Sequence, residues 1–589
     1  MDLNWSLNEL YVSFESNEFK GDLAKTDNTI ASLKKWSEEK LNNLSEPVSK
    51  MEEFVKQISE LTSLLTKLAA FPSLKISVNS KDQEALRYLE IVENKIPEMT
   101  EPMVRFQKWI GLLENLDELI ESSELLKEHK FYLNECAEKS KYILDEKEEV
   151  LIAKLQNTGS NAWSKLRDLL TSTLMVDITI DGEEKKLPLT VIKNMAYDKD
   201  PAVRKNAYEA ELKSYEKIDE SVAACLNGIK GEVITIADMR GYKSPLERTV
   251  IEARMDMESL EAMLTAIKEF LPVFHKYFKK KAELLGHNNG LPFYDLFAPM
   301  GEVNMKFTYE EAKDFIVANF NTFSSRLGNY AKHAIENNWV DVLPKEGKVG
   351  GAFCANLHPI KESRVLTNFE GSFSDVVTLA HELGHGYHGY NLIEETVLNS
   401  EYPMPIAETA SIFCETIVKN AAIKNATSEE AFMILEAEIS DAAQVIVDIL
   451  SRYLFETEVF KHRTEASVAV SELKEMMVNA QKEAYGSGLD HNYLHPYMWA
   501  CKSHYYSANY NFYNFPYAFG LLFARGLYAE YEKRGASFPE EYDKLLSVTG
   551  KNKIADITSI MGVDIHNVDF WRNSLRTIEK QIDKFISLR

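Results

Sequence analysis

Residues 373–388 read FSDVVTLAHELGHGYH. His381 and His385 are four positions apart, so on a helix the two imidazoles lie one above the other and can share one metal ion. Glu382 is turned about 100° aside and can reach a water on that ion. Because residues 376–380 are mostly apolar, the helix should be buried, where an ionisable cluster is costly unless it binds something. The pattern favours two metal ligands and a base over a merely structural pair of histidines.

A catalytic zinc site with two histidines needs a third protein ligand and an open position for water. The longer motif HExxHxxGxxH is absent, because His388 and Asn391 stand where that motif has glycine and histidine. The third ligand should therefore be a carboxylate from another helix. Glu408 is the candidate, since prolines just before it can open a helix and its neighbours in the sequence are small and apolar.

Two further residues could support the ligands. Glu415 shares the helix face of Glu408 and could hydrogen-bond a ligand histidine, although an ordinary solvated glutamate is equally compatible with the pattern. His388 shares the face of the two motif histidines, but a fourth protein ligand would close the site. We therefore expect His388 to lie behind the ligands or to contact substrate, with a plain structural role as the alternative.

An aromatic segment lies downstream of the motif. A peptide-hydrolysing site needs a hydrogen-bond donor for the oxyanion of the tetrahedral intermediate, and a tyrosine hydroxyl or a histidine can serve. Most of the segment should be core, with one or two members turned toward the metal. Its members are Tyr497, Trp499, His504, Tyr505, Tyr506, Tyr510, Phe512, Tyr513, Phe515, Tyr517 and Phe519.

Composition limits the possible partners and compartment. The 589 residues carry a formal charge of −24, which repels nucleic acid and anionic lipid. Five scattered cysteines without a CxxC pair argue against a disulfide framework. The first residues show no basic and apolar leader, and no uncharged apolar run reaches about 18 residues. The sequence thus predicts a cytoplasmic protein without nucleic-acid or membrane partners.

The low glycine and proline content predicts a mostly helical chain. We expect a helical N-terminal lobe over residues 1–190 and a catalytic domain over residues 191–589. The predicted helices cover about 27–154, 201–240, 257–285, 308–338 and most of the chain after 372. The predicted strands are a hairpin at 175–180 and 185–189, with an Asp-Gly turn, and two short strands between 341 and 368 beside a glycine loop.

The chain resembles the oligoendopeptidase F family, within the wider group of thimet-type oligopeptidases. The resemblance covers nearly the whole sequence. It rests on Trp5–Tyr11 (WSLNELY), Gly350–Cys354 (GGAFC), Asn368–His388, Ile406–Ser411 (IAETAS) and His504–Gly520.

This resemblance implies a mostly helical fold with two lobes around a deep channel, and a small sheet beside the HExxH helix. The edge of the sheet, near Gly351 and Phe353, can pair with an extended substrate. One zinc ion per chain would be held by His381, His385 and Glu408, with Glu382 as the base. His504 and a tyrosine would contact the transition state; Tyr517 is the first candidate, and Tyr510 and Tyr513 remain alternatives.

The expected function is a zinc-dependent oligoendopeptidase that hydrolyses internal bonds of short, unfolded peptides. A zinc carboxypeptidase is the nearest alternative, since such enzymes also combine HExxH with a downstream glutamate. A helical scaffold that binds peptides without cutting them is a second alternative, but it gives no role to Glu382.

Overall fold

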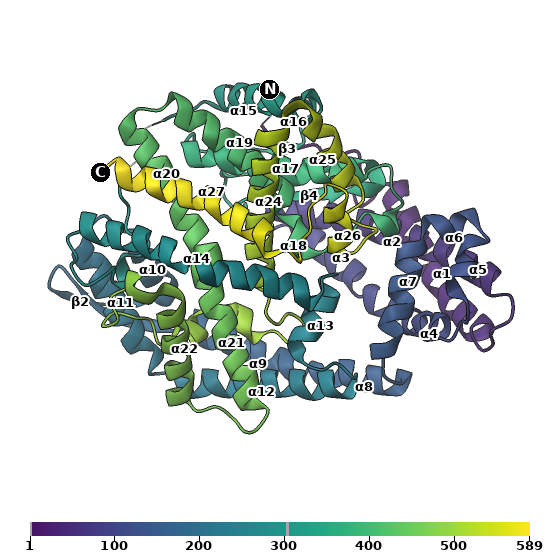
Figure 1. The fold of residues 1–589 in the computed structure, drawn as a ribbon. Helices are drawn as coiled ribbons and strands as arrows, with labels where there is room; N and C mark the ends of the chain where they lie inside the picture. The colour runs from purple at the N-terminus through teal and green to yellow at the C-terminus, as the bar shows by residue number, and fades with distance from the viewer. Residues whose placement is uncertain (1–2, 302–304) are drawn as a thin grey trace. The chain divides into compact units, whose positions relative to one another are not determined.

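The computed structural model describes residues 3–301 and 305–589, and most of these residues are helical (Figure 1). Short polar side chains begin many of the helices. Ser16 accepts a hydrogen bond from the Phe19 amide at the start of α1 (Asn17–Lys40), and Thr308 forms a capping box with Glu311 at α15 (Tyr309–Phe323). The predicted fold class, mostly α with small sheets, is confirmed.

By its internal contacts the chain divides into two compact units, and each is built from segments that are distant in sequence. Unit 1 comprises Met1–Lys147, Asn304–Ala421 and Glu530–Val563. Unit 2 comprises Glu148–Val303, Ala422–Ala529 and Asp564–Arg589.

The first part of unit 1 is a set of packed amphipathic helices. Apolar residues at helical spacing on α2, such as Phe54, Leu61 and Leu68, are buried in one core. The Phe54 ring stacks on Phe106 of α4 within this core. The helices after α1 are α2 (Pro47–Val78), α3 (Gln83–Glu93), α4 (Thr100–Ile110), α5 (Leu116–Glu121), α6 (Glu124–Glu128) and α7 (Lys130–Lys139).

A three-stranded sheet follows in unit 1, in the order β3-β5-β4. Strand β5 (Glu362–Leu366) pairs in parallel with β3 (Val340–Asp341) and antiparallel with β4 (Phe353–Leu357). The two strands predicted between residues 341 and 368 are thus present. Strands β3 and β4 form the two edges of this sheet, and Gly351 lies just before β4.

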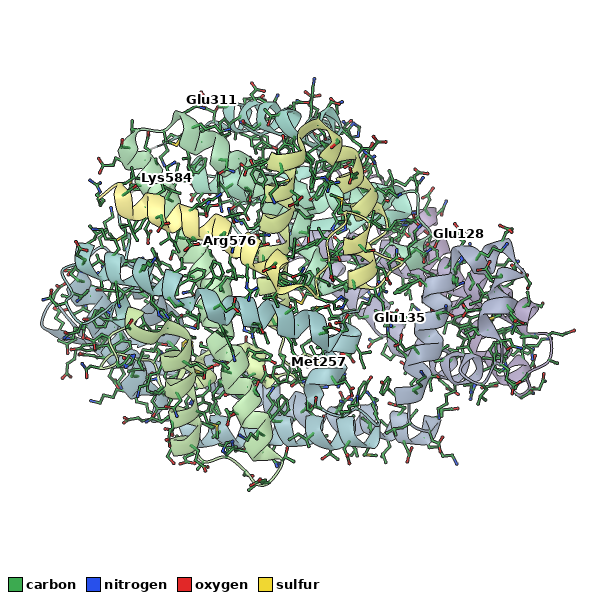
Figure 2. All side chains as sticks on the ribbon, in the orientation of Figure 1. Glu128, Glu135, Met257, Glu311, Arg576 and Lys584 are labelled. Atoms are coloured by element: carbon green, nitrogen blue, oxygen red, sulfur yellow. The ribbon has the colours of Figure 1, made fainter. Side chains whose placement is uncertain are left out.

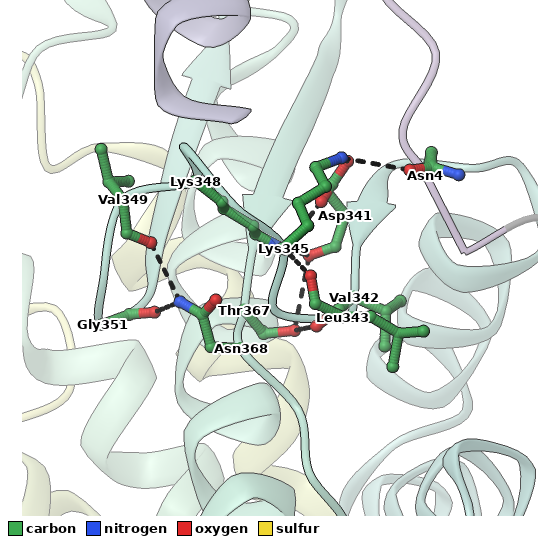
Figure 3. Close-up of polar contacts among 10 residues, drawn as sticks. All are labelled: Asn4, Asp341, Val342, Leu343, Lys345, Lys348, Val349, Gly351, Thr367 and Asn368. Atoms are coloured by element: carbon green, nitrogen blue, oxygen red, sulfur yellow. Dashed lines mark hydrogen bonds and ion pairs between the residues drawn. The ribbon is translucent and has the colours of Figure 1, made fainter. Parts of the chain in front are cut away.

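Hydrogen bonds fix the glycine loop that leads into β4 (Figure 3). The side-chain amide of Asn368 donates to the carbonyl oxygens of Val349 and Gly351, at 3.0 and 2.8 Å. The Lys348 ammonium donates to the buried Asp341 carboxylate at 2.7 Å. The loop before β4 is therefore bonded to β3 through Asp341 and to the segment after β5 through Asn368.

Helix α17 (Phe373–Leu392) carries the HExxH motif and packs against β4, β5 and α25 (Phe538–Ser547). Ser372 and Asp375 form a capping box at its start. A Cβ at Gly384 would lie 2.6 Å from the Ser411 Cα and 2.7 Å from the Ala410 carbonyl oxygen. Glycine at this position thus permits the backbones of α17 and α19 to approach closely.

The remaining helices of unit 1 surround α17. The Tyr387 hydroxyl of α17 donates to the Asp543 carboxylate of α25. The helices are α15, α16 (Ser325–Glu336), α18 (Met404–Ala407), α19 (Thr409–Asn425, most of it in this unit), α25 and α26 (Ile554–Ser559).

Unit 2 contains the predicted hairpin of β1 (Met175–Ile180) and β2 (Glu183–Pro188). Asp181 and Gly182 both have positive φ, which is the turn geometry that suits two twisted antiparallel strands. Its helices are α8 (Glu146–Gln156, except its first two residues), α9 (Ser160–Ser172), α10 (Leu189–Asn194), α11 (Pro201–Tyr215), α12 (Asp219–Met239), α13 (Pro245–Glu252), α14 (Met257–Leu284), α20 (Ser428–Ala443), α21 (Ile449–Arg463), α22 (Val470–Tyr485), α23 (Met498–Cys501), most of α24 (Phe515–Arg534), and α27 (Val568–Ser587).

The last helix of unit 2, α27, has one apolar face and one polar face, and the apolar face is buried. Trp571, Leu575 and Ile578 are buried where α27 packs along α14 and α20, whereas Arg576 and Lys584 lie on its exposed face (Figure 2). A strongly amphipathic helix of this kind is held mainly by the burial of its apolar face.

Each unit contains sequence from both sides of residue 190, because helices and strands far apart in the chain pack together. As a statement about independently folding domains, the boundary between residues 1–190 and 191–589 stays a prediction. Among the residues that the structure describes, no helix combines the length and the apolar character needed to cross a membrane.

We predict that Gly384→Ala lowers the melting temperature, because the new methyl group meets backbone atoms that cannot move aside, at a cost of about 1–3 kcal/mol. Gly21→Ala is the matched control: Gly21 lies on the exposed face of α1 with no atom within 4 Å of the added Cβ. Thermal unfolding followed by circular dichroism should show an unchanged or higher melting temperature for that control. Equal melting temperatures for Gly384→Ala and wild type would contradict the close approach of α17 and α19.

Candidate metal centre

His381 and His385 lie one turn apart on α17, and their Nε2 atoms are 3.0 Å apart. Glu408 lies between α18 and α19, and its Oε2 is 3.4 Å from His381 Nε2 and 3.6 Å from His385 Nε2. The three side chains are 23%, 18% and 24% exposed, so a ligand can reach them.

These distances fit one small metal ion. A tetrahedral ion with bonds of about 2.0–2.1 Å separates its ligand atoms by about 3.3 Å, which falls within the range observed here. Two imidazoles and one carboxylate also form a donor set that divalent transition metals accept. The three residues therefore can hold a metal ion, and they form the one such group found in the described part of the chain.

The Nδ1 atom of His381 lies 2.5 Å from Glu415 Oε1, and Lys419 donates to the other oxygen of Glu415 at 2.6 Å. Burial would raise the pKa of Glu415, but Lys419 and His381 outweigh it and hold that pKa at about 2. Burial likewise lowers the pKa of His381, yet the hydrogen bond to Glu415 raises it overall. The ionised Glu415 fixes the orientation of the His381 ring and directs Nε2 toward the site.

His385 is held from the opposite side. The amide of Asn356, on β4, donates to the His385 carbonyl oxygen at 3.2 Å. Burial and the neighbouring His381 lower the pKa of His385, which keeps its ring neutral, as metal binding requires. The sheet thus helps to position the second ligand through its edge strand.

Glu382 is only 6% exposed, and its Oε2 has no hydrogen-bond partner among the described residues. Burial raises its pKa to about 7; His381 opposes this shift, and Glu408 and Glu415 add to it. A positive ion at the neighbouring ligands would bring that pKa down again. Glu382 is therefore a buried carboxylate beside the ligands that is placed to accept a proton.

His388 is completely buried. Its Nε2 lies 2.8 Å from the Thr549 hydroxyl, and its ring stacks on Tyr402 at 3.8 Å. Substrate does not reach the ring as it lies, and a role for His388 behind the ligands stays a prediction beside a plain structural role.

Gly351 and Phe353 begin the edge strand. Gly351 adopts a φ of 79°, and Asn368 holds its carbonyl oxygen. The ring of Phe353 packs against Trp5 of the N-terminal core, 6.2 Å between centroids. Gly351, just before β4, is exposed, and Phe353, the first residue of β4, is partly exposed.

The aromatic residues predicted from the sequence form a cluster within unit 2. His504, on the short helix η9 (Ser503–Tyr506), stacks on Tyr513 at 5.6 Å, and Tyr510 and Tyr517 lie 5.5 and 5.8 Å from Tyr513. Burial lowers the pKa of His504, and Arg452 adds to this effect. The metal ligands belong to unit 1, so an approach of this cluster to the metal stays a prediction.

Three residues that contact the ligands or Glu415 are not predicted from the sequence: Ser411, Lys419 and Asn356. The Ser411 hydroxyl donates to Glu408 Oε2 at 3.0 Å, and Lys419 binds Glu415. Both follow their partner by three or four positions on a helix, so spacing could have identified them. Asn356 carries no such signal, because only the fold brings β4 beside α17.

Two family descriptions match parts of this chain. Residues 194–577 match Peptidase family M3, and residues 113–175 match the family described as Oligopeptidase F. Oligopeptidase PepF of Bacillus subtilis is 25% identical over 81% of this chain and 71% of its own. An oligoendopeptidase F homolog of Lactococcus lactis is 22% identical over 100% of this chain and 98% of its own.

Solved structures show the same fold. A protein of Chlamydophila abortus superposes with a TM-score of 0.84 at 22% identity, over 100% of this chain and 98% of that chain. Oligoendopeptidase-F of Enterococcus faecium gives a TM-score of 0.72 at 16% identity, over 97% and 98% of the two chains.

Two imidazoles on one helix, a carboxylate at the junction of α18 and α19 and a buried glutamate beside them have the chemistry of a metallopeptidase site. The chain belongs to peptidase family M3. It is a metalloendopeptidase, so the predicted family and the prediction of an enzyme rather than a non-catalytic scaffold are confirmed.

We predict that Glu408→Ala loses the metal ion, because three protein ligands hold it and none is spare. Glu415→Gln keeps all three ligands but weakens the acceptor behind His381, so metal affinity should fall about 10–100-fold. Metal content after dialysis, measured by mass spectrometry, and competition with a chelator give both values.

Glu394→Gln is the matched control, since Glu394 is 83% exposed just after α17 and should bind metal as wild type does. Stoichiometric metal with unchanged affinity in Glu408→Ala would move the third ligand elsewhere, with Glu415 next in line.

Proposed function

We propose that the chain is a zinc-dependent oligopeptidase that cleaves internal bonds of short, unfolded peptides. The observation that carries the proposal is the meeting of His381, His385 and Glu408 beside a buried glutamate, Glu382, whose Oε2 has no partner in the described structure. A peptide-binding scaffold would have no use for such a group.

In this proposal His381 Nε2, His385 Nε2 and the Glu408 carboxylate hold one zinc ion. The donor set and the spacing of the ligand atoms support zinc. When bound, zinc supplies a Lewis acid that polarises the scissile carbonyl and acidifies a water.

Glu382 then acts as the proton carrier. The attacking water gives a proton to the Glu382 carboxylate, and Glu382 passes that proton to the nitrogen of the leaving amine. Its burial and its position next to a ligand histidine support this role. One residue can serve as base and then as acid because the carboxylate that accepts the proton is a carboxylic acid until it gives the proton up.

His504 and Tyr517 are proposed to donate hydrogen bonds to the oxyanion, with Tyr510 and Tyr513 as alternatives to Tyr517. The clustering of these four side chains supports a shared role. Donors placed where charge develops stabilise the transition state more than the substrate. The proposal requires the side chains of this cluster to reach the substrate bound at the metal ligands.

An extended peptide would bind by pairing with β4. The position of β4 at the edge of the sheet supports this, because an edge strand presents unpaired backbone groups. Backbone pairing gives affinity without demanding a particular sequence. Gly351 and Phe353 would then lie at one end of the bound peptide.

We further propose that the site lies in a channel that admits short peptides and excludes folded proteins. The names of the relatives, oligopeptidase and oligoendopeptidase, support short substrates. The five cysteines are all free, which supports a reducing compartment, the cytoplasm.

Our first prediction concerns the base. Glu382→Gln should fold and retain the metal, but its turnover should fall by about 100-fold or more, because the amide cannot accept the proton. Cleavage of an internally quenched peptide, measured beside metal content, tests both parts. Turnover above a few per cent of wild type, at full metal occupancy, would remove Glu382 from the role of base.

The second prediction concerns the oxyanion donor. Tyr517→Phe should lower kcat by about 10–1,000-fold with little change in KM, because the hydroxyl acts mainly in the transition state. The same change at Tyr510 and Tyr513 provides matched controls. A silent Tyr517→Phe beside a crippled Tyr510 or Tyr513 variant would assign the donor to that other tyrosine.

The third prediction tests the function itself. Blocked peptides of about 5–20 residues should be cut at internal bonds, with broad sequence tolerance, while an intact folded protein in the same mixture survives. Mass spectrometry of the products distinguishes internal cuts from stepwise loss of C-terminal residues. Rapid digestion of the folded protein would rule out the enclosed channel, and stepwise loss would indicate a carboxypeptidase.

A further inference from the structure

A cavity of about 90 Å³ lies inside unit 2. It is lined by α10, α11, η4 (Phe293–Asp295), the π-helical turn η7 (Gln444–Asp448) and residues 495–502. No residue of the cavity belongs to the proposed metal or catalytic groups. A π-helical turn within a long helical run is rare and in many proteins marks a functional site.

The lining of the cavity contains apolar and cationic side chains, which we call its apolar wall and its cationic wall. Aromatic side chains, among them Tyr208 and Phe293, form the apolar wall. The cationic wall is formed by Lys193, Arg204 and Lys502. A ligand that satisfies both walls must combine a compact apolar group with a negative charge.

The two carboxylates that line the cavity already have partners. Glu211 accepts a hydrogen bond from the Tyr215 hydroxyl at 2.9 Å and lies 3.5 Å from His495 Nε2. Asp448 forms an ion pair with Arg452, which lies outside the cavity. These acids therefore do not neutralise the lysines by direct contact.

The cationic groups, by contrast, have unused donors. Within the described residues, the ammonium groups of Lys193 and Lys502 form no hydrogen bond or ion pair. Arg204 uses Nε for the buried Asp295 and Nη1 for backbone carbonyls, which leaves Nη2 unpaired. The buried Nδ1 of His495 also has no partner.

Lys502 is half-buried, and partial burial of an ammonium group without a partner carries a free-energy cost. Burial lowers the pKa of Lys502, and the charge of Arg452 lowers it further, while the charge of Asp448 partly opposes the shift. A bound anion would offset both effects, because it brings the missing opposite charge and accepts hydrogen bonds.

We propose that this cavity binds a small carboxylate with a compact apolar group. The carboxylate would lie between Lys193, Lys502 and the free Nη2 of Arg204, and the apolar group would pack against the aromatic wall. Inorganic phosphate offers charge without an apolar part and should bind more weakly.

Calorimetry with the metal-loaded protein can test the proposal with isovalerate as the probe. Isovaleramide and isoamylamine have nearly the same shape but are neutral and cationic, and inorganic phosphate lacks the apolar group. We expect isovalerate to bind with one site per chain, and the other three probes to bind at least about tenfold more weakly. No isovalerate binding at millimolar concentration, or equal binding of the amide, would overturn the proposal.

Substitutions then locate the site. Lys502→Met and Lys193→Met should each weaken isovalerate binding by about tenfold or more, since each removes a charge-assisted hydrogen bond. Lys213→Met is the matched control, because Lys213 is exposed on α11 and does not line the cavity. If Lys502→Met fails to fold, the Lys193 variant, whose side chain is half-buried, decides the question. Unchanged affinity in the folded lysine variants would overturn the proposal.

A last control separates the cavity from the metal centre, which could also bind a carboxylate. Isovalerate binding should persist after a chelator has removed the metal ion. Loss of binding together with the metal would assign the carboxylate to the metal centre and reject the cavity. Affinity rather than activity is measured because Lys502 lies two residues before His504.

Discussion

Helix α17 must lie close to α19 for the Glu408 carboxylate to reach the imidazoles of His381 and His385. This close approach limits which residues can lie between the two helices. Gly384 faces the backbone at Ser411, where any larger side chain would hold the helices apart. From α19, Ser411 then reaches Glu408, and Glu415 reaches His381. On the opposite side Asn356 fixes His385. A packing contact without any charged group thereby determines where the charged groups can meet.

Three glutamates lie around the two histidines, and their surroundings give them different chemistry. Glu415 is held ionised by Lys419 and His381, with a pKa of about 2. Glu382 is less exposed to solvent than Glu415, no lysine lowers its pKa, and that pKa rises to about 7. One carboxylate can therefore orient a ligand while another moves a proton, although the side chains are identical.

Periodicity and spacing made much of this predictable. The motif helix, the candidate third ligand Glu408 and the hairpin turn at Asp181-Gly182 depend on residues near one another in the chain, so local patterns reveal them. The break of helix at Glu408, between α18 and α19, was not expected, because tertiary packing determines it. The contact of Asn356 with His385 and the segments that form each unit also could not be predicted, because they depend on contacts between residues far apart in the chain.

The order of segments within the units bears on how the chain is made. Unit 1 includes residues 530–563, whose helix α25 packs against α17, and unit 2 includes α27, which packs along α14. During synthesis the N-terminal segments emerge first, yet both cores stay incomplete until the last segments follow. A growing chain must therefore carry exposed apolar surface on both units for most of its synthesis. With this topology, the exposed apolar surface of a growing chain must be kept from associating with other chains until synthesis ends.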